Sequence, residues 1–170
     1  LFLVSCSDME QNPVAFGKKL DAFISEAEGR AGGEGFKVAE DMVRLGYVGV
    51  PPMAPSLYGY LEELGARVVF NETQRQFSLP FGTPDLVEKY RLYSYPYSIF
   101  YRLEDIGREI ERRELAGIIH YVQSFCFRQV EDIILRRYLD VPILTLELDR
   151  ETELDSRARV RLESFVEMLR

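Results

Sequence analysis

The chain has 170 residues, enough to bury a hydrophobic core without disulfide bonds, so its two cysteines need no structural pairing. Acidic residues outnumber basic ones by 28 to 21, and the resulting net charge of -7 disfavours nucleic acid as a partner. No apolar run approaches the roughly 20 residues of a membrane-spanning helix, so we expect a cytoplasmic protein with no membrane contact.

The first 35 residues are predicted to form a helix and a linker. Asn12-Pro13 precedes apolar residues at helical spacing, and a glycine-rich run ends that pattern. The sequence starts without Met inside an apolar run, so we expect residues 1–35 to be the remainder of an upstream domain. Residues 36–170 are then expected to form one α/β domain.

Apolar segments of strand length alternate with helical patterns in the rest of the chain. Pro51-Pro52 ends the first strand, because proline cannot donate to a central ladder. The charged face of the amphipathic helix at 99–114, which includes Arg102, is expected to be solvated. The predicted strands are 44–50, 66–70, 117–122 and 142–148, and the predicted helices are 56–64, 99–114, 124–138 and a last one capped by Asp155 or Ser156.

Strands that alternate with helices of this length pair in parallel through right-handed crossovers. We therefore expect an α/β fold with a four-stranded parallel sheet in the flavodoxin-like order 2-1-3-4 and helices on both faces. In such sheets, ligands bind outside the carboxyl edge where the strand order reverses, here between the first and third strands. This places Pro52 and Met53 beside the turn that follows the third strand, and Glu147 and Asp149 end the fourth strand at the same edge.

Cys126 is the most informative residue of this edge, because it lies where the third strand turns into the next predicted helix. The first turn of a helix favours an anion, so the position suits a thiolate or a metal ligand. The alternative is a small buried side chain between Phe125 and Phe127, since free cysteine is often buried. Gln123 and Ser124 share the turn and either support such a site or cap the helix.

The other polar residues of the edge have two interpretations each. His120 is the only histidine, and it lies inside the third strand. We interpret it as a hydrogen-bonded interior residue rather than a catalytic one, because nothing ensures that it reaches the thiol of Cys126. Glu147 and Asp149 are either turn residues or substrate-side residues of the site.

Five segments in order carry a family resemblance: 49–52, 61–69, the run YVQSFC at 121–126, 141–149 and 159–165. Together they resemble the carboxyl-terminal domain of the 2-hydroxyacyl-CoA dehydratase and benzoyl-CoA reductase family. The likeness covers roughly residues 40–170, and the order of the matched segments is more specific than any single one.

The resemblance implies that Cys126 is the carboxyl-terminal cysteine ligand of a 4Fe-4S cluster, with Gln123, Ser124 and Phe125 beside it. Family members use the cluster to pass one electron, supplied by an ATP-driven activator protein, to a CoA thioester. The electron serves either loss of water, a lyase reaction, or reduction of an aromatic ring. The implied partners are an upstream domain of the same polypeptide, a related subunit, the activator and an acyl-CoA substrate.

The resemblance also implies a limit on what this chain does alone. The other cluster cysteines of the family come from an earlier domain, and the context of Cys6 does not match their motifs. We therefore expect the isolated chain to hold no cluster and to be inactive. The main alternative is a non-catalytic α/β accessory or interaction domain that retains the fold, and a third is a flavodoxin-like ligand-binding module.

Overall fold

The computed structural model describes residues 12–31, 41–79, 81–149 and 153–170. The chain divides into two units, residues 1–41 and Met42–Arg170. In the first unit, helix α2 (Pro13–Ala31) begins where the side chain of Asn12 accepts hydrogen bonds from the backbone N–H groups of Val14 and Ala15. The linker expected at 31–35 and the boundary expected at residue 35 lie almost wholly outside the described residues.

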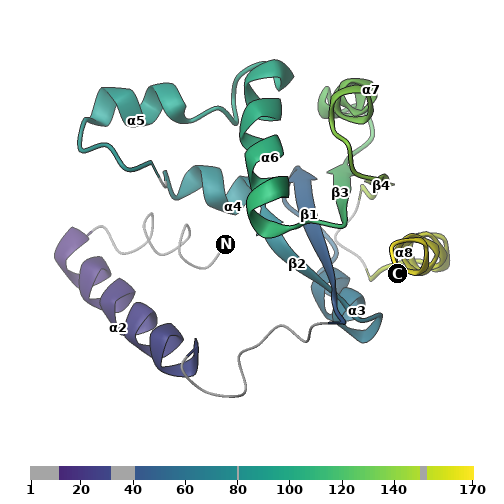
Figure 1. The fold of residues 1–170 in the computed structure, drawn as a ribbon, viewed down its shortest axis with the longest axis horizontal. Helices are drawn as coiled ribbons and strands as arrows, with labels where there is room; N and C mark the ends of the chain where they lie inside the picture. The colour runs from purple at the N-terminus through teal and green to yellow at the C-terminus, as the bar shows by residue number, and fades with distance from the viewer. Residues whose placement is uncertain (1–11, 32–40, 80, 150–152) are drawn as a thin grey trace. The chain divides into compact units, whose positions relative to one another are not determined.

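The second unit is built on a four-stranded parallel sheet in the order β2-β1-β3-β4, which confirms the predicted topology (Figure 1). The two central strands are almost fully buried, as expected where helices cover both faces. Each strand lies within one residue of its predicted bounds, and β3 matches them. The strands are β1 (Val43–Gly49), β2 (Ala66–Asn71), β3 (Gly117–Val122) and β4 (Ile143–Glu147).

Helices pack on both faces of this sheet, as the alternating pattern predicts (Figure 1). Leu61 of α3 and Leu162 of α8 share one buried cluster with Tyr47 of β1. Ile106 of α6 and Leu135 of α7 form another cluster, on the opposite face. The helices of this unit are α3 (Leu57–Glu63), α4 (Glu72–Phe77), α5 (Leu86–Leu92), α6 (Ile99–Arg113), α7 (Arg128–Tyr138) and α8 (Ser156–Met168).

The helices differ from the prediction in two places. Helices α4 and α5 lie between the second strand and the helix at 99–114, where no helix was predicted. Helix α7 begins at Arg128 rather than at residue 124, because Phe125 takes a left-handed backbone conformation with φ of 62° that interrupts the helix. None of the described helices combines the length and the apolar character that crossing a bilayer requires.

The charged face of α6 is only partly solvated. Its residues Glu104, Arg108, Glu111 and Arg112 are exposed as expected, whereas others are buried. Arg102 is fully buried, and its Nε and Nη2 atoms donate to the carboxylate of Glu72 at 2.6 and 2.7 Å. Asp105 and Glu109 on the same helix are also buried, and Arg75 pairs with both of them. Helix α4 supplies Glu72 and Arg75, so the unpredicted helix explains why these charges are covered.

The amino terminus of α8 offers a direct test of helix capping. The carboxylate of Asp155 accepts a hydrogen bond of 2.7 Å from the backbone N–H of Ala158, which satisfies a donor at the helix start. Replacing Asp155 with alanine should therefore lower the free energy of unfolding by about 1 kcal/mol. Urea denaturation measures this loss, and Ser156→Ala is the matched control. An equal loss in both variants would contradict the assignment of Asp155 as the cap.

Candidate functional site

The site begins at the carboxyl ends of the two central strands, where β1 separates from β3. The backbone N–H of Val50 donates to the carbonyl of Tyr121 at 3.1 Å, and the chain then leaves the sheet. The N–H of Met53 donates to the hydroxyl of Tyr121 at 3.0 Å, while this hydroxyl donates to the carbonyl of Leu148 at 3.5 Å. Burial raises the pKa of Tyr121, so its phenol stays protonated and holds the two loops together.

The structure brings predicted residues from both sides of this edge into contact. The side-chain amide of Gln123 donates to the sulfur of Met53, so the turn after β3 touches the loop after β1. Pro52 lies beside Met53 and is half-buried. We predicted that these two segments meet where the strand order reverses, and the contact between Gln123 and Met53 confirms it.

A second group of predicted residues meets at the end of β4. The carboxylate of Asp149 accepts hydrogen bonds from the backbone N–H and the hydroxyl of Ser124, each at 2.5 Å. The hydroxyl of Ser124 also approaches a carboxylate oxygen of Glu147 at 3.1 Å, and Gln129 donates to the other oxygen. One interpretation was that Ser124 caps the following helix, but Ser124 is not the N-cap of α7. Its contacts tie the turn to the neighbouring strand end.

Cys126 lies in that turn, two residues before α7 begins. We expected it within the first turn of the helix, and the structure places it just ahead of that turn. Its N–H donates to the carbonyl of Gln123 at 3.0 Å, and its carbonyl accepts from the N–H of Gln129 at 3.0 Å. The thiol is free and half-buried. Phe125 is fully exposed and Phe127 is 67% exposed, so the two phenylalanines do not enclose the cysteine in an apolar core.

His120 is an interior residue, as expected. Its Nδ1 lies 2.9 Å from a carboxylate oxygen of Asp132 on α7, and we assign a proton to Nδ1 because the carboxylate can only accept. Among the described residues, nothing forms a hydrogen bond with the buried Nε2. Burial lowers the pKa of His120, although the bond to Asp132 opposes that shift.

Burial of neutral His120 should make stability depend on pH. The unfolded chain binds a proton at this histidine near its ordinary pKa of about 6.5, whereas the folded chain binds it only at lower pH. Stability therefore falls as the pH drops below about 6.5, with a slope of at most about 1.4 kcal/mol per pH unit. Urea unfolding from pH 7.5 to 5 should show this slope, and His120→Gln should flatten it. A variant with the slope of the native chain would contradict the prediction.

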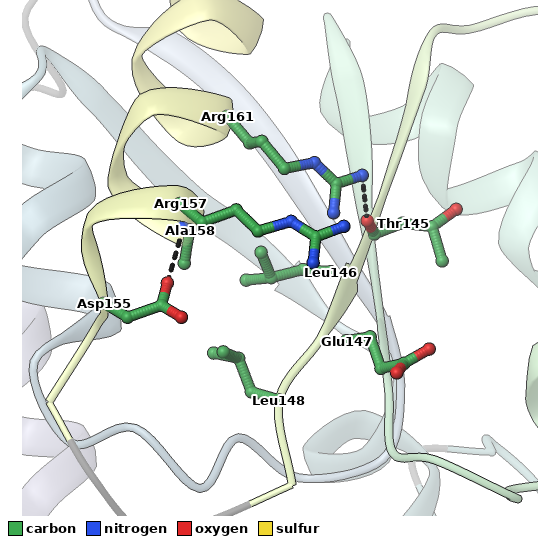
Figure 2. Close-up of a pocket in the computed structure, with 8 residues that line it drawn as sticks. All are labelled: Thr145, Leu146, Glu147, Leu148, Asp155, Arg157, Ala158 and Arg161. Atoms are coloured by element: carbon green, nitrogen blue, oxygen red, sulfur yellow. Dashed lines mark hydrogen bonds between the residues drawn. The ribbon is translucent and has the colours of Figure 1, made fainter.

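A pocket of about 260 Å³ lies between β4 and α8 (Figure 2). Arg157 and Arg161 reach from α8 toward the strand, and Arg161 donates to the carbonyl of Thr145 at 2.7 Å. Sequence reasoning missed these arginines, because charges on an amphipathic helix usually mark a solvated face. Their spacing behind the cap at Asp155 is the signal that could have found them. No residue of the Cys126 turn lines this pocket.

The chemistry of the site depends on what Cys126 can bind. A thiolate in a turn at a sheet edge is a suitable ligand for iron. Within residues 12–31, 41–79, 81–149 and 153–170, no group of three histidine, cysteine or acidic side chains could hold a metal ion. Cys126 is the one cysteine among the described residues, so these residues provide at most one thiolate ligand. Cys6 lies outside the described residues.

Comparison with known proteins adds to these observations. No curated protein was found to match the chain. The sequence profile of one family, described as 2-hydroxyglutaryl-CoA dehydratase, D-component, matches residues 1–169. Because this match spans nearly the whole sequence, the chain belongs to the 2-hydroxyglutaryl-CoA dehydratase D-component family.

Proposed function

We propose that this chain is part of a 2-hydroxyacyl-CoA dehydratase and that it contributes Cys126 as one thiolate ligand of a 4Fe-4S cluster. The observation that carries the proposal is the placement of a free, half-buried thiol in a turn at the carboxyl edge, where the strand order reverses. Membership of the dehydratase family supports loss of water rather than ring reduction as the reaction.

The remaining ligands come, in this proposal, from residues that the structure does not describe. Clusters of this type are held by several cysteine thiolates. An upstream domain of the same polypeptide and a related subunit are the expected sources. When bound, the cluster passes one electron from an ATP-dependent activator protein to a CoA thioester. The reducing cytoplasm suits both the cluster and the free thiol.

The residues around Cys126 have supporting roles in this proposal. Ser124 and Asp149 hold the turn through two hydrogen bonds, and Gln123 joins it to Met53. Second-shell contacts of this kind orient a ligand and tune its metal. The exposed ring of Phe125 would exclude water once another surface covers the turn. Pro52, Met53, Glu147 and Asp149 are proposed to face the acyl-CoA.

An activity assay of the whole protein tests this function. The full-length protein would be purified without oxygen together with its related subunit, and iron and sulfide would be measured. Adding the activator, ATP and a reductant should then start the loss of water from a 2-hydroxyacyl-CoA. Omission of ATP is the control. A preparation with full iron and sulfide that reduces an aromatic acyl-CoA instead would contradict dehydration, and one without iron would contradict the cluster.

One observation favours the alternative of a non-catalytic interaction domain. Large apolar side chains are exposed on the first turn of α6 and on α7: Phe100, Tyr101, Val130, Ile133 and Tyr138. Exposed apolar groups of this kind are typical of surfaces that contact another protein. The two functions differ in one measurement, because an accessory domain would pair with its partner protein while the complex contained no iron.

A further inference from the structure

A buried arginine connects three helices beneath the carboxyl edge of the sheet. Arg102 on α6 binds Glu72 on α4 through two nitrogens, at 2.6 and 2.7 Å, and its Nη1 donates to Glu131 on α7. All three residues are buried. Hydrogen bonds and charge attraction from Glu72 raise the pKa of Arg102 despite its burial, so the guanidinium stays charged.

Both carboxylates extend this contact to the edges of the site. Glu72 accepts from the backbone N–H of Gly49, the last residue of β1, at 3.3 Å. Glu131 lies 3.5 Å from Nη1 of Arg128, the first residue of α7. The network of contacts around Arg102 therefore reaches the end of β1 on one side and the start of α7 on the other.

Tyr95 contacts both ends of this network, Gly49 and Arg128. Its hydroxyl donates to the carbonyl of Gly49 at 2.7 Å. Its own carbonyl accepts from Nη2 of Arg128 at 2.9 Å, and the guanidinium of Arg128 lies 4.1 Å from the centre of its ring. Each residue of the network thus contacts at least two of the others. Its members are Gly49, Glu72, Tyr95, Arg102, Arg128 and Glu131.

The charges of this network balance, because it contains two arginines and two glutamates. Burying four ions is costly, and apolar side chains of the same volume often give equal or greater stability. A buried network of hydrogen bonds and ion pairs instead favours one arrangement of the elements that it joins. Among the described residues, Nη1 of Arg128 has no hydrogen-bond partner, and its only contact in the network is the ion pair with Glu131. Here those elements carry the two sides of the site, because Gly49 precedes the loop with Met53 and Arg128 follows Cys126 by two residues.

We infer that Arg102 is a positioning residue that, through Glu131 and Arg128, fixes the Cys126 turn against the loop after β1. The inference rests on the proposed role of Cys126 as a cluster ligand. The described hydrogen bonds and ion pairs of Arg102 are with Glu72 and Glu131, so its effect on the turn passes through the start of α7. Loss of the guanidinium should free the turn while the sheet remains formed.

The reactivity of the Cys126 thiol tests this inference without any cluster. All variants would carry Cys6→Ser, so that iodoacetamide reports on Cys126 alone, and rates would be measured where unfolding is negligible. Arg102→Met should raise the rate of alkylation by about tenfold, and Glu131→Gln should raise it less. Arg102→Lys keeps the charge but loses the paired contact with Glu72, so an intermediate rate is expected.

A matched control lies at the other end of α6. Arg113 pairs with buried Glu109 and donates to the carbonyl of Val69, away from the carboxyl edge. Arg113→Met should reduce stability but leave the alkylation rate unchanged. If Arg102→Met fails to fold, Arg102→Lys and Glu131→Gln carry the test. Alkylation rates equal to that of the parent in all the Arg102 and Glu131 variants that fold would overturn the inference.

The cluster gives a second measurement in the full-length protein. Arg102→Lys should shift the electron paramagnetic resonance signal of the reduced cluster, because the ligand turn moves, whereas Arg113→Met should not. An unchanged signal together with unchanged thiol reactivity would refute the positioning role and leave the proposed function standing. A cluster that survives Cys126→Ser would refute the proposed function instead, so the two failures are distinguishable.

Discussion

Replacing Cys126 with serine is expected to remove most of the iron from the full-length protein and to abolish its dehydratase activity. Serine has nearly the same size, but its hydroxyl is a poor ligand for an iron-sulfur cluster. The half-buried thiol lies in a turn outside both apolar clusters, so the free energy of unfolding should change by less than about 1 kcal/mol. Iron and sulfide analysis beside thermal unfolding would measure both effects.

The neighbouring serine supplies the control for this prediction. Ser124→Ala removes the hydroxyl contacts with Glu147 and Asp149 but keeps the backbone bond from Ser124 to Asp149. It should retain the cluster and lower activity more mildly, because the turn is weakened rather than deprived of its ligand. Full iron content in Cys126→Ser would show that the thiol is not a ligand.

The strands could be predicted from the sequence because their signals are local. Each is a short apolar run that ends at a proline, a polar residue or a glycine, and β3 is buried along its whole length. The strand order follows from the alternation with helices, and the meeting of Gln123 with Met53 follows from that order. These parts of the fold and site depend on periodicity and topology alone.

The burial of Arg102 could not be predicted in the same way. Its two carboxylate partners are 30 and 29 residues away in the sequence, and one begins a helix in a region without clear periodicity. A charged residue on an amphipathic helix usually lies in solvent, and only tertiary contacts reverse that expectation. The start of α7 was missed for a related reason, because the left-handed conformation of Phe125 has no strong local signal.

Replacing Gly49 with alanine is expected to lower the free energy of unfolding by about 3 to 5 kcal/mol. The backbone of Gly49 has φ of 103°, which side chains strongly disfavour, and an added Cβ would lie 2.1 Å from the carbonyl oxygen of Tyr121. Relief of this clash would pull β1 from β3 and break the bonds that Gly49 forms with Glu72 and Tyr95.

Another glycine of the same domain provides a matched control for this prediction. Gly59 lies in α3, and an added Cβ there would meet no atom within 4 Å. Gly59→Ala should therefore stabilise the protein by up to about 1 kcal/mol, since alanine favours a helix. Urea denaturation of both variants should give changes of opposite sign. If Gly49→Ala were as stable as the native chain, the tight approach of β1 to Tyr121 would be wrong, and so would the geometry that places the Met53 loop beside the Cys126 turn.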